Sequence, residues 1–167
     1  GGPDDDSGVF PYSSHNDTWM FNDRRAWEFL PQTARNTPPA RFHHDMTSTK
    51  VGTVVMYGGM FYEGEGNNGI PKFYSDLWLF SIAEKQWSQL HPTPGVPQDG
   101  MPSKRALHRM AMFTPPNYNH PLVLMFGGRL APTNGNKDTN ETWVMELLGN
   151  TGHPSRDNLQ AKWYLVP

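Results

Sequence analysis

A glycine pair recurs three times along the chain, and this repetition constrains the fold more than any other feature of the sequence. The first glycine of each pair precedes a tryptophan by 18, 20 and 16 positions (1 to 19, 58 to 78, 127 to 143), and an acidic residue lies two places before each tryptophan. Such self-similarity is typical of folds built from repeated units. The recurring residues are Gly1, Gly2, Gly58, Gly59, Gly127 and Gly128, then Asp17, Asp76 and Glu141, then Trp19, Trp78 and Trp143.

Short runs of β-forming residues, separated by turn signals, fill each unit. Two of them, 54–57 and 122–126, are nearly continuous apolar runs that end at a glycine pair, as expected for strands buried on both faces. No 11-residue window has a clean helical stripe, so we expect an all-β chain with one four-stranded antiparallel sheet per unit. The ten expected strands are 17–22 and 26–30 in the first unit, 42–49, 51–57, 76–80 and 86–90 in the second, and 107–113, 122–126, 142–147 and 162–166 in the third.

The composition supports this fold class and excludes several classes of function. The 167 residues include 16 glycines and 16 prolines, which favour turns between strands. The net charge is −2 and no segment forms a basic stripe, so we expect no nucleic-acid partner. No apolar stretch approaches the roughly 18 residues needed to span a bilayer. The chain has no cysteine, which excludes disulfides, thiolate metal sites and cysteine nucleophiles within it.

The cellular compartment stays open at this level. The lack of disulfides and of a signal-like N-terminus favours the cytoplasm. Asn16 and Asn140 each begin an N-glycosylation pattern, which keeps secretion as an alternative.

Two further elements recur at equivalent positions. A second tryptophan lies on the last strand of each unit, where a large ring can fill the wedge between sheets. An Arg-x-x-His element precedes the first strand of the second and third units. These residues are Trp27, Trp87 and Trp163, and Arg41 with His44 and Arg105 with His108.

Together, these features resemble kelch repeats over nearly the whole chain. The resemblance implies a kelch-type β-propeller built from four-stranded antiparallel blades. WD-type propellers are the alternative, but the sequence has no Trp-Asp dipeptide, and corresponding tryptophans are 59 and 65 residues apart (19 to 78, 78 to 143). Because the kelch period is about 50 residues, the excess implies inserted loops.

On this interpretation the chain is one partial propeller of about two and a half blades. Residues 1–30 form the second half of one blade, and 42–90 and 105–167 form two complete blades. A propeller closes with about four to eight blades. We therefore expect the remaining blades to come from the same longer chain or from another chain, with self-assembly of copies as a weaker alternative.

Residues that could carry chemistry are better explained as structure. The Arg-x-x-His elements and the acidic residues recur in successive units, whereas a catalytic group is needed once. We expect the acids to pair with the arginines or to bind backbone amides at strand starts. His43 and His44 are adjacent on a strand and point to opposite faces, so they cannot easily share a metal. We expect no catalytic residue, no cofactor and no metal; residues 4–6 are expected to form a solvated acidic loop.

The long connectors predict a binding surface. In a four-stranded antiparallel sheet, the second-to-third connectors and the connectors between sheets emerge at one end, and these are the long ones here. Long loops on a rigid scaffold concentrate binding residues. Some of these rings could instead pack the loop onto its own blade. The candidate protein-binding residues are Phe61, Tyr62, Glu63, Glu65, Lys72, Phe73, Tyr74, Arg129 and Lys137.

The sequence therefore predicts a non-catalytic protein-interaction scaffold, and two alternatives stay open. The first is a non-catalytic part of an enzyme, galactose-oxidase-like or other, whose active site lies outside this segment. The second is a structural subunit of a large assembly, in which sheet edges and outer strands make the contacts.

Overall fold

The computed structural model describes residues 14–31, 36–49, 52–63, 69–91, 100–118, 120–132, 137–148 and 160–167. Within these ranges the chain is all-β, with antiparallel pairing throughout and no helix. Gly1, Gly2, Glu65 and the acidic run 4–6 lie outside the described residues.

Three sheets carry the repeat. The first is a hairpin of two strands, and the second and third each contain four strands in chain order. Aromatic, β-branched, leucine and methionine residues together make up most of these strands, as expected for strands that pack against neighbouring sheets. The strands are β1 (Thr18–Phe21) and β2 (Trp27–Leu30); β3 (Asp45–Thr49), β4 (Thr53–Tyr57), β7 (Leu77–Ser81) and β8 (Gln86–Leu90); β10 (Arg109–Phe113), β11 (Leu122–Phe126), β14 (Thr142–Leu148) and β15 (Gln160–Val166).

All ten expected strands are present, and two of them, β8 and β11, have the expected bounds. The first strands of the second and third sheets begin later than expected. His43 and Leu107 have φ of 57° and 63°, and this left-handed conformation is incompatible with an extended strand. The turn that these residues make is therefore part of the repeat.

The expected count of ten strands is nevertheless wrong, because five further strands form in or beside the connectors. The connector that follows the glycine pair folds back on itself in both complete units. In the second unit this gives the hairpin β5–β6, and in the third the small sheet β13–β12–β9. These strands are β5 (Met60–Glu63), β6 (Ile70–Phe73), β9 (Arg105–Ala106), β12 (Arg129–Leu130) and β13 (Lys137–Asp138).

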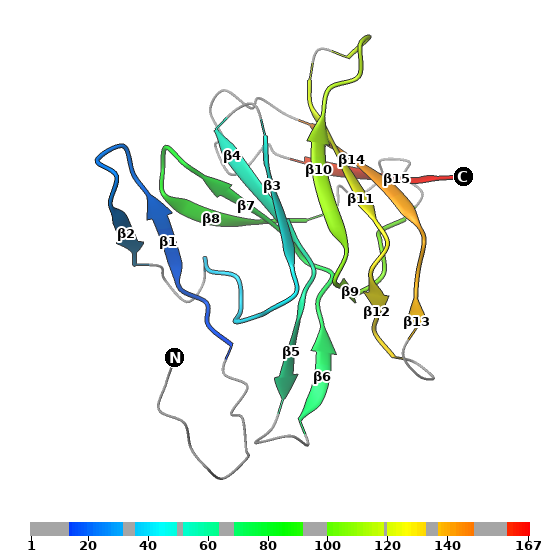
Figure 1. Ribbon diagram of the computed structural model, residues 1–167. Coiled ribbons are helices and arrows are strands. Elements are labelled where there is room, and N and C mark those ends of the chain that lie inside the picture. Colours follow the sequence, from blue (N-terminus) through cyan, green and yellow to red (C-terminus); the bar gives the residue numbers. More distant parts are fainter. Residues whose placement is uncertain are drawn as a thin grey trace.

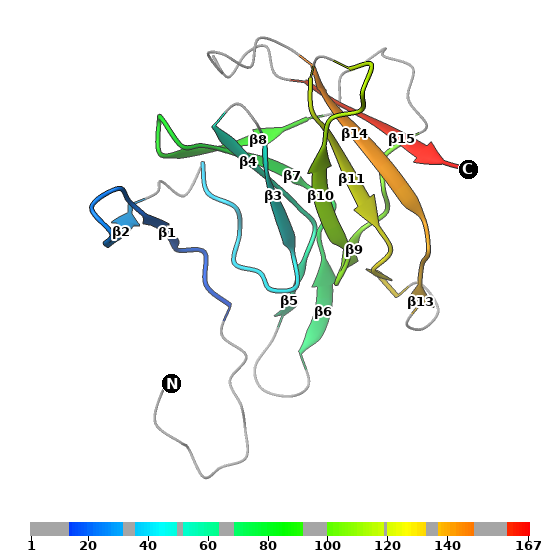
Figure 2. The same ribbon diagram turned by 45° about the horizontal axis from the view of Figure 1, so that its top comes forward.

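The second and third sheets meet along their first strands. Figures 1 and 2 both show β3 beside β10. The Leu107 amide donates to the His43 carbonyl (2.9 Å), and the Met110 amide donates to Asp45 Oδ2 (2.7 Å). A carboxylate that accepts a backbone amide from the neighbouring sheet fixes the position of one sheet against the other.

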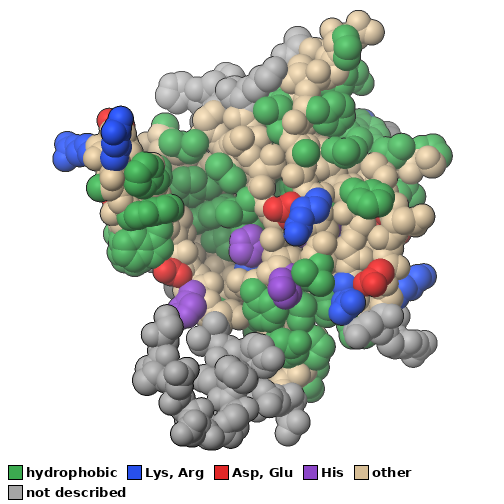
Figure 3. Space-filling view, in the orientation of Figure 1, with side chains coloured by type: hydrophobic (Ala, Val, Ile, Leu, Met, Phe, Trp, Pro, Cys, Tyr) green, Lys and Arg blue, Asp and Glu red, His purple; other side chains and the backbone are tan. Residues whose placement is uncertain are grey.

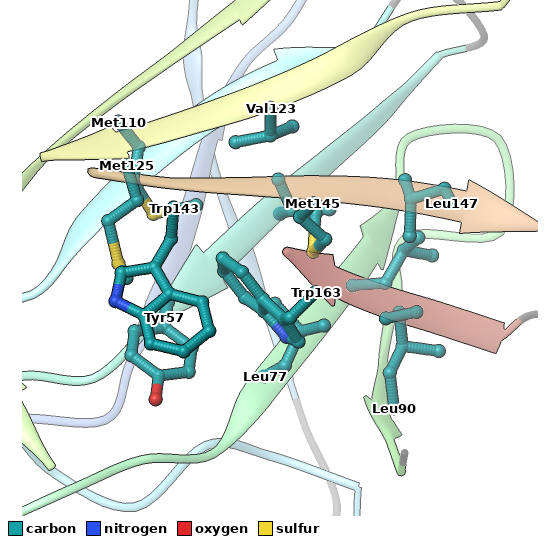
Figure 4. Packing of buried hydrophobic residues seen from close by; sticks show 13 residues of the cluster. Tyr57, Leu77, Leu90, Met110, Val123, Met125, Trp143, Met145, Leu147 and Trp163 are labelled. Carbon is teal, nitrogen blue, oxygen red and sulfur yellow. The ribbon is translucent and has the colours of Figure 1, made fainter. Parts of the chain in front are cut away.

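The main core lies between these two sheets (Figure 4). Trp163 is fully buried, with its ring edge-on to Tyr57 at 5.2 Å and to Trp143 at 6.5 Å. Methionine side chains at 110, 125 and 145 fill the space around these rings. Burial of each such large side chain contributes about 1.5–3 kcal/mol.

The second sheet is covered on its other face as well. Trp78, Phe80 and Trp87 pack there against Leu30 and Met20 of the β1–β2 hairpin. As a result every residue of β7 is buried. Burial on both faces explains why the central strands are nearly continuous apolar runs.

One expectation about the tryptophans fails. Trp87 and Trp163 are buried between sheets, as expected, but Trp27 is 68% exposed. The reason is that no sheet among the described residues covers the outer face of the β1–β2 hairpin. Burial at this position depends on a neighbouring sheet and not on the hairpin itself.

Candidate binding face and its supporting clamps

A buried arginine joins both ends of the connector 59–75. Arg41 Nη1 donates to the Gly58 carbonyl (2.8 Å) and to Asp76 Oδ1 (2.6 Å), and Nη2 donates to Asp76 Oδ2 (2.7 Å). Asp76 Oδ2 also accepts the Trp78 indole N–H (2.6 Å). We call this group, Arg41 with Gly58 and Asp76, the first clamp.

The second clamp repeats this arrangement around the connector 128–140. Arg105 Nη1 donates to the Gly127 carbonyl (3.0 Å), and Nη2 donates to Glu141 Oε2 (2.6 Å). The same carboxylate oxygen accepts the Trp143 indole N–H (3.0 Å). The hydrogen bonds from Trp143 and Arg105 hold the pKa of Glu141 below its usual value. The expected pairing of acids with arginines is thus present in both complete units.

In the two described pairs, the second glycine is required because neighbouring atoms approach it closely. Gly59 has φ of +93°, and a Cβ there would lie 2.9 Å from His44 Cβ. Gly128 has φ of +102°, and a Cβ there would lie 3.0 Å from His108 Cβ. An L side chain would be strained at both positions. Gly59 and Gly128 therefore pack on the histidine of their own unit.

These histidines support the glycine turns: His108 is fully buried and His44 is half-buried. Neither ring nitrogen of His108 has a hydrogen-bond partner within the described chain. Burial lowers its pKa to about 4. Burial also lowers the pKa of His44. Both rings are therefore neutral at pH 7.

The first clamp positions the β5–β6 hairpin, which extends away from the second sheet (Figure 1). The Phe61 ring stacks on Tyr74 at 5.5 Å between centroids, and the Arg41 guanidinium lies 4.0 Å from the Tyr74 centroid on its ring face. Burial raises the pKa of Tyr74. Tyr62 packs against Phe42 at 5.7 Å. The aromatic rings therefore hold the hairpin in one position on its own sheet.

Charged residues surround these rings at the same end of the molecule. Lys72 Nζ lies 2.9 Å from Glu63 Oε2 across the hairpin. Arg129 Nε donates to Asp138 Oδ1 (3.0 Å) in the β12–β13 hairpin, which lies at this end of the sheets as well (Figure 1). We call the surface formed by the β5–β6 and β12–β13 hairpins the connector face.

The nine candidate residues divide by exposure. Glu63, Lys72 and Lys137 are exposed, whereas Phe61, Tyr62, Tyr74 and Arg129 are half-buried. Phe73 is buried against Met60 and Ala106, so its ring supports the hairpin and is closed to a partner. Glu65 lies outside the described residues.

Sequence reasoning missed one residue of this face. Ile70 begins β6 and is 64% exposed. A β-branched residue directly after Gly69, within an otherwise polar stretch, was the available signal. This exposed aliphatic side chain adds apolar surface to the connector face.

No family model matches the chain. No group of three or more histidine and acidic side chains that could hold a metal occurs within the described ranges. The described residues also form no helix that is long and apolar enough to cross a membrane.

Proposed function

We propose that this chain is part of a kelch-type β-propeller and serves as a non-catalytic protein-interaction scaffold, with its partner bound on the connector face. The repeated strand order, the stacking of three sheets and the contact between the first strands β3 and β10 support this architecture. Blades arranged around a central axis would bring their first strands together in this way.

The observation that carries the binding proposal is the clamped β5–β6 hairpin. It presents Phe61, Tyr62 and Ile70 with the charged pair Glu63 and Lys72 beside them. Aromatic and aliphatic anchors within a charged rim are the arrangement in which a few residues carry most of the binding energy. Because the hairpin is already held by the clamp, little conformational entropy is lost on binding.

Affinity capture from the native source tests this proposal with matched variants. Ile70→Ser removes an exposed aliphatic side chain from the connector face, and Ile82→Ser removes one that is 45% exposed in the β7–β8 turn. We expect Ile70→Ser to weaken capture of the principal partner about tenfold, as loss of a contact residue does. Ile82→Ser should leave capture unchanged. Equal capture by the wild type and both variants, with unfolding midpoints matched, would refute the connector face.

A second candidate function, a structural subunit of a larger assembly, is favoured by a different surface. Trp19, Phe21, Trp27 and Phe29 lie on the outer face of the β1–β2 hairpin, and each is more than half exposed. Figure 3 displays the hydrophobic side chains of this hairpin as a contiguous patch at the left. Patches of this kind mark interaction sites. A structural subunit would use this face instead of the connector face. A partner that still binds the Ile70→Ser variant but no longer binds the Trp27→Ser variant would favour this second function.

A further inference from the structure

Four residues other than glycine have the left-handed backbone conformation within the described chain, and they occupy two pairs of equivalent positions. Arg25 and Lys85, with φ of 61° and 54°, lie in the turns that join the last two strands of the first and second units. His43 and Leu107, with φ of 57° and 63°, lie at the turn that precedes the first strand of the second and third units. The repeat therefore requires this conformation at both turns.

The turn at position 107 does not require a leucine. Glycine and asparagine adopt the left-handed conformation at lower energy, and histidine, the equivalent residue of the second unit, is also enriched there. Packing does not explain the leucine either. Its side chain is 43% exposed and belongs to none of the three hydrophobic clusters that the described residues form. Backbone strain at an exposed bulky residue is an indication of function.

Leu107 lies between the two hairpins of the connector face. It follows β9, which pairs with β12, and its amide donates to the His43 carbonyl (2.9 Å). His43 is exposed, and its ring lies edge-on to Phe42 at 4.9 Å. Phe42 forms the bridge to β5 and packs on Tyr62 at 5.7 Å. A row of apolar and aromatic side chains therefore connects the small sheet of the third unit to the β5–β6 hairpin of the second.

Cations border Leu107 on both sides along the chain. Arg109 is exposed, and its Nη1 donates to the carbonyl of the preceding residue (3.0 Å), which is adjacent to Leu107. Lys104 is exposed three residues before Leu107. Asp45, the acid on the neighbouring strand β3, is half-buried, and its two oxygens accept backbone amides at 3.0 and 2.7 Å. The charge around Leu107 therefore complements a carboxylate on a partner.

We propose that Leu107 is the apolar anchor of the connector face, and that it binds a linear protein segment in which an apolar side chain is flanked by an acidic residue. The apolar side chain contacts Leu107 and the rings of His43 and Phe42. The carboxylate binds Arg109 and Lys104. This inference rests on the proposed function, because it names the part of the connector face that the partner contacts and the chemistry of that partner.

Peptides selected on the whole chain from a phage-displayed library of random dodecapeptides are the probe. Their Kd is measured for the wild type and for matched variants. Leu107→Asn removes the apolar side chain and suits the turn, whereas Leu107→Met keeps an apolar side chain. Arg25→Asn makes the same backbone change in the β1–β2 turn, outside the connector face, and is the control.

We expect the selected peptides to share an apolar residue next to an acidic one. Leu107→Asn should weaken their binding at least about tenfold, and Leu107→Met by less than about threefold. Arg25→Asn should leave the Kd unchanged. Both asparagine substitutions should raise the thermal unfolding midpoint by about 1–4 °C, because each relieves backbone strain. Arg109→Gln should weaken binding about threefold and reduce its dependence on salt.

Failure of the wild type to select any peptide would overturn the proposal, as would peptides whose Kd is unchanged by Leu107→Asn. If those peptides still lose affinity for Ile70→Ser, the connector face stands and only the Leu107 anchor fails. Peptides that are insensitive to both substitutions would refute the connector face as well. A lower unfolding midpoint for Leu107→Asn would show that the leucine stabilises the fold by packing and would also contradict the proposal.

Discussion

The two clamps have the same hydrogen-bond pattern but differ in the acid and in its surroundings. Asp76 uses both oxygens to bind Arg41, and its side chain is 15% exposed. Glu141 binds Arg105 through one oxygen, and its side chain is 35% exposed. The Arg41 guanidinium also lies on the ring of Tyr74, whereas the described residues provide no such ring for Arg105.

This difference distinguishes the contacts that both units share from the contacts that occur in one unit only. In both units the arginine binds the carbonyl of the first glycine. We infer that the turn at the glycine pair requires this contact. The number of acid contacts varies, so the acid's share of the stability should vary as well. Three sets of variants test this distinction.

Removal of the arginine should have the largest effect and should separate the two clamps. Arg41→Met leaves the Asp76 carboxylate in a mostly buried site, and we expect a loss of about 3–5 kcal/mol in the free energy of unfolding. Arg105→Met leaves Glu141 able to regain water, so we expect a smaller loss of about 2–3 kcal/mol. Urea unfolding followed by fluorescence measures both. Equal losses would mean that the glycine carbonyl contact dominates and that the acid contributes little.

Substitution of the first glycine of each pair should lower the free energy of unfolding by different amounts in the two units, and we expect this difference to be smaller than for the arginines. Gly58 and Gly127 have φ of 63° and 68°, so alanine is strained at both, at about 1–2 kcal/mol. At Gly58 a Cβ would also lie 2.5 Å from the Arg105 carbonyl, which would have to move, whereas at Gly127 the nearest described atom is the Thr139 carbonyl at 3.3 Å. We expect Gly58→Ala to exceed Gly127→Ala by about 1–3 kcal/mol.

The control for this comparison is asparagine, which tolerates the left-handed region better than alanine. Gly127→Asn should therefore cost less than Gly127→Ala in the same urea experiment. If the two alanine variants unfold at the same urea concentration, the contact between Gly58 and the next unit does not constrain the fold.

Substitution of the histidines should have the smallest effect, and it should appear only in the pH dependence of the free energy of unfolding. The pKa of His108 is lowered from 6.5 to about 4 in the folded state, so the unfolded chain binds more protons between these values. Stability from this residue is complete above about pH 6.5 and is lost as the pH falls, by about 2 kcal/mol at pH 5. His108→Gln should flatten the dependence of unfolding free energy on pH between 7 and 5.

His44→Gln is the comparison in the other unit. Its pKa is also lowered by burial, but the ring is half-buried, so the same substitution should flatten the profile less. The lowered pKa of Glu141 acts below its ordinary value of 4.5, outside this window. An equal flattening by both variants would show that the second sheet encloses its histidine as fully as the third.

Sequence alone predicts those parts of the fold that residue type and recurrence determine. The bounds of β8 and β11 follow from aromatic and aliphatic runs between turn signals. The clamps follow from the recurrence of Arg-x-x-His and of an acid near tryptophan. Strands β5 and β6 do not follow, because Gly69 next to β6 and Pro71 within it disfavour a strand locally. They exist through pairing with each other and through the bridge of Met60 to Phe42.

The environment of a residue is harder to predict than its role in the repeat. Trp27 and Trp87 hold equivalent positions, yet one is 68% exposed and the other 7%. The difference arises from the sheet stacked on each, which is a long-range property of the chain. Asp45 was missed for the same reason, since its contact with the Met110 amide crosses between sheets.

Each clamp fixes the two ends of its connector and makes no hydrogen bond with the described residues in the middle of it. Residues 59–75 and 128–140 differ in length and composition, yet an arginine holds the two ends of each in the same way. The residues in the middle of a connector can therefore be replaced while its ends stay in position. We expect that a foreign peptide, grafted in place of residues 63–70 so that the buried Met60 and Phe73 are kept, changes what the protein recognises while shifting the thermal unfolding midpoint by only a few degrees.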